Sequence, residues 1–226
     1  MWVSSGTAAA KARGSPAASA LVRADSTAPG RHGIPREEVA ENQRWRLIGA
    51  AAEVLAEYGP VRTTSTRVAK RAGVSPATFY QHFENVGDCL LAAYRAEMDS
   101  IWEVVSDACD QTEIEWPERL GVAVASTLRF LAVEPAMSRL LGAEAPASVT
   151  AIAGAREGAV ERLAGLLASG RKQRPKGSKE LPPGTERHLI AGVFAILAHT
   201  VGSGDAERLP ELATQLTAML AAPYVR

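Results

Sequence analysis

Two short helical patterns separated by a glycine turn constrain this chain more than any other feature of its sequence. Thr64 is a favourable N-cap for the first helix, and Gly73 suits the left-handed position that ends it. Ser75 and Pro76 then supply the N-cap and the first-turn proline of a second helix. This spacing predicts a helix-turn-helix.

The second of these helices has faces of different character. Phe79 and Phe83 lie four residues apart, so both point to the same side, which we expect to be the core. The side chains left outward or on the flanks are small or polar: Ala77, Thr78, Tyr80, Gln81 and His82. Such a face fits the major groove of DNA, which is about 12 Å wide, with the N-terminal residues of the helix against base edges.

Helices are also predicted on both sides of this motif. The segment from Arg44 to Tyr58 repeats apolar residues at helical spacing and is closed by Gly59-Pro60. Asn85 with Asp88 three residues later resembles a capping box and opens a long connector helix. We therefore expect a three-helix DNA-binding domain over residues 37–84, followed by a connector helix.

Several short motifs in this domain together carry a family resemblance. They are Gly59, Thr63-Thr64, Val68-Ala69, Ala72-Gly73-Val74-Ser75 and Ala77-Thr78-Phe79-Tyr80-Gln81-His82-Phe83. The segment resembles the DNA-binding domain of TetR-family regulators. The resemblance implies phosphate contacts by Thr64, Thr78, Tyr80 and His82, and base contacts by Thr66, Ser75, Pro76, Ala77 and Gln81.

The charge of the helix-turn-helix segment is consistent with DNA binding. Between positions 62 and 82 the cations are Arg62, Arg67, Lys70 and Arg71, and the segment contains no acid. A local excess of cations suits phosphate groups, so Arg67 and Lys70 join the candidate DNA-binding residues. The net charge of the whole chain is zero, and charge alone would not indicate DNA.

Residues 1–36 differ in composition from the rest of the 226-residue chain. They are mostly Ala, Gly, Ser, Thr and Pro, and Asp25 is their one acid. Their cations are Lys11, Arg13, Arg23, Arg31 and Arg36. We expect a disordered basic tail, with an additional DNA-binding arm and a transit peptide as alternatives.

The two cysteines indicate in which cellular compartment the protein is expected. Cys89 and Cys109 lie twenty residues apart on one predicted helix, about 30 Å at roughly 1.5 Å per residue, which is too far for a disulfide. Reduced thiols are typical of the cytoplasm, and no stretch of the sequence is long and apolar enough to span a membrane. We expect a cytoplasmic bacterial protein.

Residues 85–226 are predicted to form a helical ligand-binding and dimerisation domain. The expected helices run from Asn85 to about Gln111, from Pro117 to Val133, briefly after Pro135, from about Ala147 to Ser169, from Thr185 to about Gly202, and from Leu209 to Ala222. A loop is expected from Gly170 to Gly184, a segment rich in proline and cations. The predicted fold class is all-α.

The last two helices carry the candidate dimer interface. Their stripes consist of Ala191, Ala195, Ala198 and Gly202 on the first, and Leu212, Leu216 and Met219 on the second. Small residues let another helix approach closely, and the resemblance implies that these helices pair with their symmetry mates in a four-helix bundle. The alternative is that both stripes belong to the core of one subunit.

Arg156 interrupts an apolar stripe and marks a candidate effector site. A buried cation needs a partner, so Arg156 could anchor an anionic or carbonyl-bearing effector; alternatively it reaches solvent or pairs with Glu157. The residues that could line such a pocket are Met98, Trp102, Phe130 and Met137, each of which core packing could also explain.

Motifs for metal or catalytic chemistry are lacking in the sequence. His188 and His199 have no second ligand at metal spacing, and there is no glycine-rich phosphate loop or nucleophile elbow. No metal, cofactor or enzyme activity is therefore expected.

These patterns together predict a homodimeric TetR-like regulator of transcription. We expect a repressor that a small hydrophobic effector releases from a palindromic operator by moving the connector helix. Two alternatives stay open. An effector-independent DNA-binding protein would have no cavity beneath Trp102, and an all-helical enzyme would have a polar, titratable pocket.

Overall fold

The computed structural model describes residues 35–111, 113–133, 135–142 and 150–225. The predicted disordered tail therefore lies outside the described residues except for its last two positions. The elements in chain order are α2 (Arg36–Tyr58), η1 (Pro60–Arg62), α3 (Ser65–Arg71), α4 (Pro76–His82), α5 (Val86–Cys109), α6 (Trp116–Val133), α7 (Pro135–Gly142), α8 (Thr150–Leu167), η3 (Ala168–Gln173), α9 (Thr185–Gly202), η4 (Ala206–Leu212) and α10 (Ala213–Ala221). Over the described ranges there is no strand, and the all-α prediction is confirmed.

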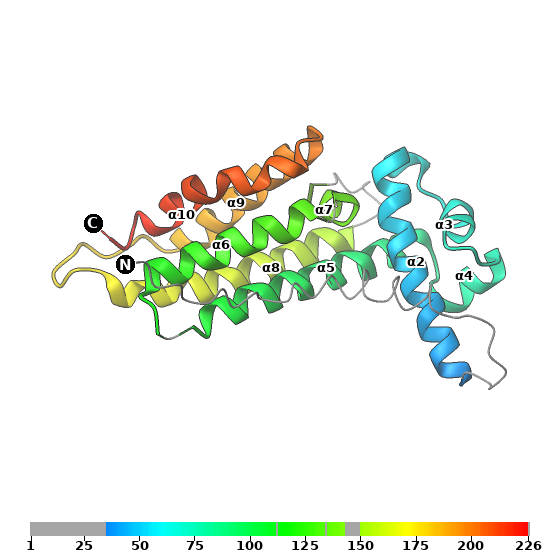
Figure 1. Cartoon of the computed structure of the whole chain (residues 1–226), viewed down its shortest axis with the longest axis horizontal. Coiled ribbons are helices and arrows are strands. Elements are labelled where there is room, and N and C mark those ends of the chain that lie inside the picture. Colours follow the sequence, from blue (N-terminus) through cyan, green and yellow to red (C-terminus); the bar gives the residue numbers. More distant parts are fainter. Residues whose placement is uncertain (1–34, 112, 134, 143–149, 226) are drawn as a thin grey trace, which may run out of the picture.

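The helices form two groups that α5 connects (Figure 1). Helices α2 to α4 lie at one end of the elongated molecule, and α6 to α10 pack along α5 to form a bundle at the other. None of the described helices is long and apolar enough to cross a membrane.

The predicted caps of the helix-turn-helix are confirmed. Thr64 Oγ1 accepts a hydrogen bond from the backbone N–H of Arg67 at 3.4 Å, and Ser75 Oγ accepts one from Thr78 at 3.0 Å. Gly73 has a φ of 65°, which an L-residue adopts only at a cost. Local bonds thus set the turn between α3 and α4.

Helix α2 is longer than predicted, beginning at Arg36 rather than Arg44. Pro35 precedes it, and Glu37 and Glu38 lie in its first turn, where negative charge stabilises the positive end of the helix dipole. These first turns are exposed and polar, so they contain no apolar stripe for the periodicity to detect.

The last predicted helix is divided. The segment from Ala206 to Leu212 is a 3₁₀-helix, and α10 begins only at Ala213. Pro210 lacks a backbone N–H and cannot continue α-helical hydrogen bonding, which accounts for the division. Part of the predicted loop after Gly170 is likewise helical, because η3 extends α8 as far as Gln173.

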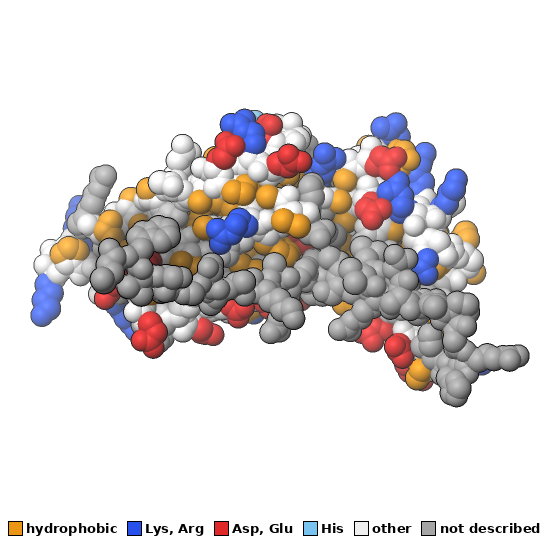
Figure 2. All heavy atoms as spheres, viewed as in Figure 1, with side chains coloured by type: hydrophobic (Ala, Val, Ile, Leu, Met, Phe, Trp, Pro, Cys, Tyr) orange, Lys and Arg blue, Asp and Glu red, His pale blue; other side chains and the backbone are white. Residues whose placement is uncertain are grey.

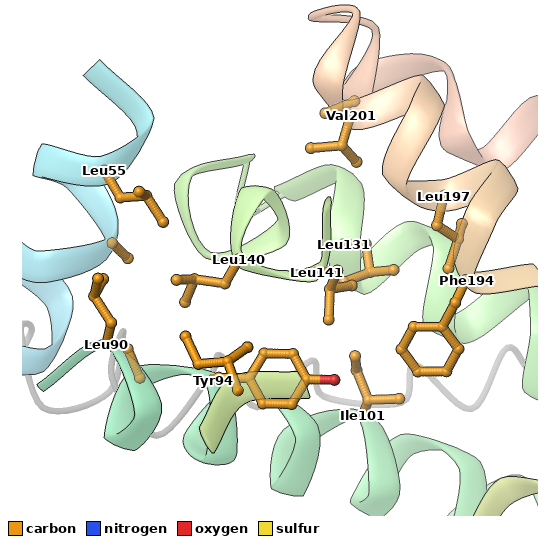
Figure 3. Packing of buried hydrophobic residues seen from close by; sticks show 14 of the residues in the cluster. Leu55, Leu90, Tyr94, Ile101, Leu131, Leu140, Leu141, Phe194, Leu197 and Val201 are labelled. Atoms are coloured by element: carbon orange, nitrogen blue, oxygen red, sulfur yellow. The ribbon is translucent and has the colours of Figure 1, made fainter. Parts of the chain in front are cut away.

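One hydrophobic core runs from the DNA-binding helices into the bundle. In Figure 3, Leu140 of α7 lies between Leu55 of α2 and the side chains of the larger bundle, with Leu90 and Tyr94 of α5 beneath it. Each such side chain contributes about 1.5 to 3 kcal/mol when fully buried. Helix α7 therefore fastens the DNA-binding helices to the bundle.

Candidate DNA-binding face and effector cavities

Aromatic packing fixes the orientation of α4. Phe79 is fully buried and Phe83 nearly so, and their ring centroids lie 5.9 Å apart. With this face of the helix held against the core, its predicted base-contacting residues are exposed: Ser75 at the N-cap, Pro76 and Ala77 in the first turn, and Gln81 near the C-terminal end. Thr78 is half-buried and also bonds the Ser75 hydroxyl at 2.9 Å.

Further candidate DNA-binding hydroxyls lie at the start of α3 and on α4. Thr64, a predicted phosphate contact, and Thr66, a predicted base contact, are exposed at the start of α3. Tyr80 projects from α4, and its hydroxyl lies 2.9 Å from Ser65 Oγ. Sequence reasoning missed Ser65, because its contact with Tyr80 joins two helices that no local pattern relates.

His82 is placed differently from the other candidate residues. It is half-buried, and its Nε2 lies 3.4 Å from Gln43 Oε1 of α2. Burial lowers its pKa, and the nearby Arg44 lowers it further. The neutral imidazole is therefore favoured at neutral pH, so His82 would serve a phosphate as a hydrogen-bond donor rather than as a cation.

The cations of this face are unequal in the charge that they present to DNA. Arg71 pairs with Glu53 at 2.9 Å and also with Glu57, both on α2, so its charge is largely compensated. Lys70 is exposed, and Arg67 lies over the Tyr58 ring with its Cζ 5.0 Å from the centroid. Figure 2 shows Lys and Arg side chains gathered over the end of the molecule that η1 and α3 form.

The bundle contains a cavity of about 170 Å³ between α5, α6, α8, α9 and α10, which we name cavity A. Its wall is mainly apolar, and its end near α7 is lined by Leu131, Leu141 and Leu197 (Figure 3). Polar groups line the opposite end, near the C-terminus of α5: Cys109, Arg119 and Ser169.

A hydrogen-bonded cluster lies beside that polar end. Trp116 Nε1 donates to Ser169 Oγ at 3.1 Å, and the Trp116 ring packs edge-on against Tyr224. The Tyr224 hydroxyl donates to Glu186 at 3.1 Å, and Arg171 donates to both oxygens of that carboxylate at 2.7 and 2.8 Å. The cluster ties η3 and the C-terminal segment to α6 and α9.

A second cavity, of about 310 Å³, lies between α5 and α8, and we name it cavity B. Trp102 lines it, and the guanidinium of Arg162 stacks on the indole with its Cζ 3.4 Å from the ring centroid. Met98, Ile101 and Leu163 line both cavities, so only side chains separate them.

The structure corrects part of the predicted effector site. Met98 borders both cavities and Trp102 borders cavity B, but Phe130 and Arg156 line neither of them. The prediction that Phe130 and Arg156 border one cavity together with Met98 and Trp102 is therefore wrong. The side chain of Met137 lies outside the described part of the chain.

Arg156 has a structural partner instead. It donates to the carbonyl oxygen of Leu141 at 2.9 Å, and its Cζ lies 5.8 Å from the Phe194 ring centroid. The carbonyls of the last helical turn have no partner within the helix, and Arg side chains commonly bind them. Arg156 thus caps α7, which explains a cation at an interrupted apolar stripe.

The candidate dimer residues differ in how far they are exposed to solvent. Ala191, Ala195 and Gly202 are exposed on α9, and Ala198, Leu212 and Met219 are half-buried. Leu216 is 3% exposed and lines cavity A, so its assignment to the dimer interface is wrong. The helical stripe of α10 faces the core of its own subunit at that position.

A solvent-facing recognition helix, joined by one continuous helix to a bundle with an apolar cavity, defines a helix-turn-helix DNA-binding protein with a second, cavity-bearing domain. Residues 47–93 match the family model described as bacterial regulatory proteins, tetR family. The part of the chain that contains the helix-turn-helix is therefore similar to that family.

Two curated proteins are similar over part of the chain. The fatty acid metabolism regulator protein of Bacillus subtilis is 29% identical over 87 residues, 38% of this chain and 44% of that protein. The HTH-type transcriptional activator FasR of Mycolicibacterium smegmatis is 32% identical over 98 residues, 43% of this chain and 42% of that protein. The chain thus matches less than half the length of each.

Solved structures show that the fold extends over both domains. The fatty acid degradation regulator FadR of Bacillus halodurans superposes with a TM-score of 0.60 at 18% identity, over 84% of this chain and 97% of that one. FadR of Bacillus subtilis, solved in complex with stearoyl-CoA, gives a TM-score of 0.65 at 21% identity, over 78% and 97%.

Proposed function

We propose that this chain is a homodimeric transcriptional repressor that binds a palindromic operator through α4 and is released by a long-chain acyl compound such as a fatty acyl-CoA. The observation that carries the proposal is cavity A. This apolar space is bordered by α5, the same helix whose N-terminal turns pack in the core of the DNA-binding domain. A ligand in it acts directly on the element that positions α4.

The DNA-binding part of the proposal rests on the exposed face of α4. Ala77 and Gln81 face solvent, while Phe79 and Phe83 hold the helix rigidly from behind. Gln81 can bind adenine through two hydrogen bonds, and the methyl of Ala77 suits a thymine methyl. Thr64, Tyr80 and Lys70 flank this face and would bind phosphates, which set position rather than sequence.

The chemistry of cavity A favours an aliphatic ligand. Leu, Ile, Val and Phe side chains dominate the wall, and such a wall binds hydrocarbon without leaving polar groups unsatisfied. The fold resembles that of a FadR solved with stearoyl-CoA, which supports an acyl chain as the occupant. The apolar wall does not favour the enzyme alternative, and the cavity itself does not favour an effector-independent protein.

The size of cavity A suggests how binding would act on DNA. At about 170 Å³ it is close to a cavity of about 150 Å³ that accepts benzene, so a long acyl chain must push the surrounding helices apart. Movement of α5 would change the spacing of the two recognition helices in a dimer. A coupling of about 1 to 3 kcal/mol per site lowers operator affinity about 5- to 150-fold.

A twofold dimer completes the proposal, because a palindromic operator requires two recognition helices related by symmetry. The exposed stripe of Ala191, Ala195 and Gly202 on α9 would allow a close helix-helix approach in such a dimer. A regulator of bacterial operators acts in the cytoplasm, where the chromosome lies.

The test begins with operator selection from random duplex DNA with the purified full chain. Fluorescence anisotropy then measures the affinity for the selected site, with stearoyl-CoA, stearate or CoA added. We expect a palindromic site and at least fivefold weaker binding with a long-chain acyl compound. Unchanged operator affinity with all three compounds would reject the effector. A reporter that falls in expression when the protein is deleted would show an activator instead.

A further inference from the structure

We propose that cavity B binds the anionic head of the acyl effector through Arg95 and Arg162, while its hydrocarbon chain passes Met98 into cavity A. This inference rests on the proposed function, because it assigns the second half of the same ligand. The ligand class is an amphiphile with a long apolar chain and a phosphate or carboxylate head.

Arg95 and Arg162 lie together at one cavity, without the carboxylate partners that Arg171 and Arg187 have. Arg171 and Arg187 pair with carboxylates. Arg95 and Arg162 line cavity B, and neither forms an ion pair with any residue that the structure describes. These two cations outnumber the one carboxylate of the lining, that of Asp99, and this balance favours an anionic ligand over a neutral one.

Stacking prepares Arg162 for an oxyanion. Its Cζ lies 3.4 Å from the centroid of the Trp102 ring, so the indole face supports the guanidinium plane. A guanidinium held in this way keeps its N–H edge available, and that edge matches the geometry of a phosphate or a carboxylate. Little side-chain freedom is then lost when the anion binds.

The position of cavity B relative to cavity A suits a ligand with both parts. Met98, Ile101 and Leu163 form a shared wall, and Met98 is an unbranched side chain that adapts its shape readily. Rotation of Met98 would open a passage from the arginines to the apolar space. An acyl chain could then lie in cavity A with its head at Arg95 and Arg162.

A polar atom lies where the head would meet the chain. Tyr94 lines cavity B, and in Figure 3 its hydroxyl points toward Ile101 and Leu141, which line cavity A. This hydroxyl is buried and has no hydrogen-bond partner among the described residues. A buried hydroxyl without a partner is unfavourable by about 1 to 3 kcal/mol, and a carbonyl or carboxylate oxygen of the ligand would satisfy it.

Asp99 opposes the two arginines in the same cavity. Its carboxylate is exposed and lines cavity B beside Trp102. Repulsion between this carboxylate and an anionic head would weaken binding, so removing its charge should have the opposite effect to removing an arginine. Substitution of Asp99 and substitution of an arginine should therefore change ligand affinity in opposite directions.

The experiment measures binding of stearoyl-CoA, stearate and CoA to the full chain by isothermal titration calorimetry. We expect R95Q and R162Q each to weaken acyl ligand binding about tenfold or more, as loss of a charge-assisted hydrogen bond does, and D99N to strengthen it. R129Q is the matched control, because Arg129 is an exposed arginine of α6 that bonds only locally to Ser126. Its affinity should equal that of the unaltered chain.

The three ligands separate the sources of the anion. Stronger binding of stearoyl-CoA than of stearate, lost in R162Q, would assign the cavity to the CoA phosphates, whereas equal effects of R162Q on both would assign it to any acyl anion. Unchanged binding in R95Q and R162Q, while L131W in cavity A abolishes it, would overturn this inference and leave the proposed function intact. Failure of the unaltered chain to bind any acyl ligand would instead overturn the proposed function.

Discussion

Arg139 of α7 donates a hydrogen bond to the backbone carbonyl of Ala56 in α2 at 2.6 Å, and so joins the bundle to the DNA-binding helices. The two residues that follow extend this connection. Leu140 is buried in the core beside Leu55, and Leu141 lines cavity A. Three successive residues of α7 therefore link the cavity wall to the backbone of α2, beside the longer route through α5.

The first prediction concerns this link. R139Q should weaken the response of operator binding to stearoyl-CoA by about 0.5 to 2 kcal/mol, or roughly 2- to 30-fold, because one connection between cavity and α2 is lost. Operator affinity without effector should change little. Anisotropy titrations with and without stearoyl-CoA measure both quantities, with R129Q as the control. An effector response equal to that of the unaltered chain would exclude Arg139 from the coupling.

The second prediction concerns base recognition. Gln81 is exposed on α4 and can hold adenine through two hydrogen bonds, so Q81A should weaken binding to the selected operator by about 1 to 3 kcal/mol. Preference at one base pair of each half-site should relax. Operator selection repeated with Q81A measures this preference, and retention of the original consensus would contradict the assignment.

The third prediction compares two neighbouring cations of α3. Lys70 is exposed, whereas Arg71 is paired with Glu53 and Glu57. If Lys70 binds a phosphate, K70A should reduce the slope of log affinity against log salt by about 0.9. R71A should leave the slope unchanged and instead lower the free energy of unfolding by up to about 1 kcal/mol. Equal salt slopes for K70A and the unaltered chain would remove Lys70 from the phosphate contacts.

The fourth prediction concerns pH. The hydrogen bond from Arg171 lowers the pKa of Glu186 against the effect of burial, and Tyr224 lowers it further. Because the folded-state pKa lies below the unfolded value of about 4.3, the ionised carboxylate stabilises the fold above that pH, and this stabilisation is lost as the pH falls through the folded pKa. E186Q should therefore destabilise the protein by about 1 to 3 kcal/mol at pH 7.

Urea unfolding at pH 7 and at a series of values below 4.3 tests this expectation. The difference in unfolding free energy between E186Q and the unaltered chain should shrink toward acid pH. A difference that stays constant over that range would show that the charge of Glu186 contributes nothing.

The fifth prediction concerns assembly. Ala195 is exposed on α9 within the small-residue stripe, so A195F should prevent close approach of a second α9 and separate the dimer. Operator binding should then fail although the subunit stays folded. Sedimentation velocity gives the mass, and A153F on the exposed surface of α8 is the control. An intact A195F dimer would place the interface elsewhere.

The features that the sequence alone determined are those in which the interacting atoms lie within a few residues of each other. Thr64, Gly73, Ser75 and Asn85 act as caps and stops through backbone bonds to their own turn, so the helix-turn-helix was predictable. The inward face of α4 followed from the spacing of Phe79 and Phe83. The start of α2 is exposed and polar, so it has no apolar stripe by which periodicity could indicate a helix.

Only the tertiary structure decided which of several apolar stripes border a cavity and which fill the core. Periodicity identifies a buried face but not the residue opposite it, so the sequence cannot distinguish a dimer contact of Leu216 from the place in the wall of cavity A that it occupies. The sequence leaves a ligand anchor and a solvent-exposed or ion-paired cation as alternatives for Arg156, because its partner, the carbonyl of Leu141, comes from another helix. The arrangement of Arg162 on Trp102 likewise depends on how α5 and α8 pack, which no spacing within either helix specifies.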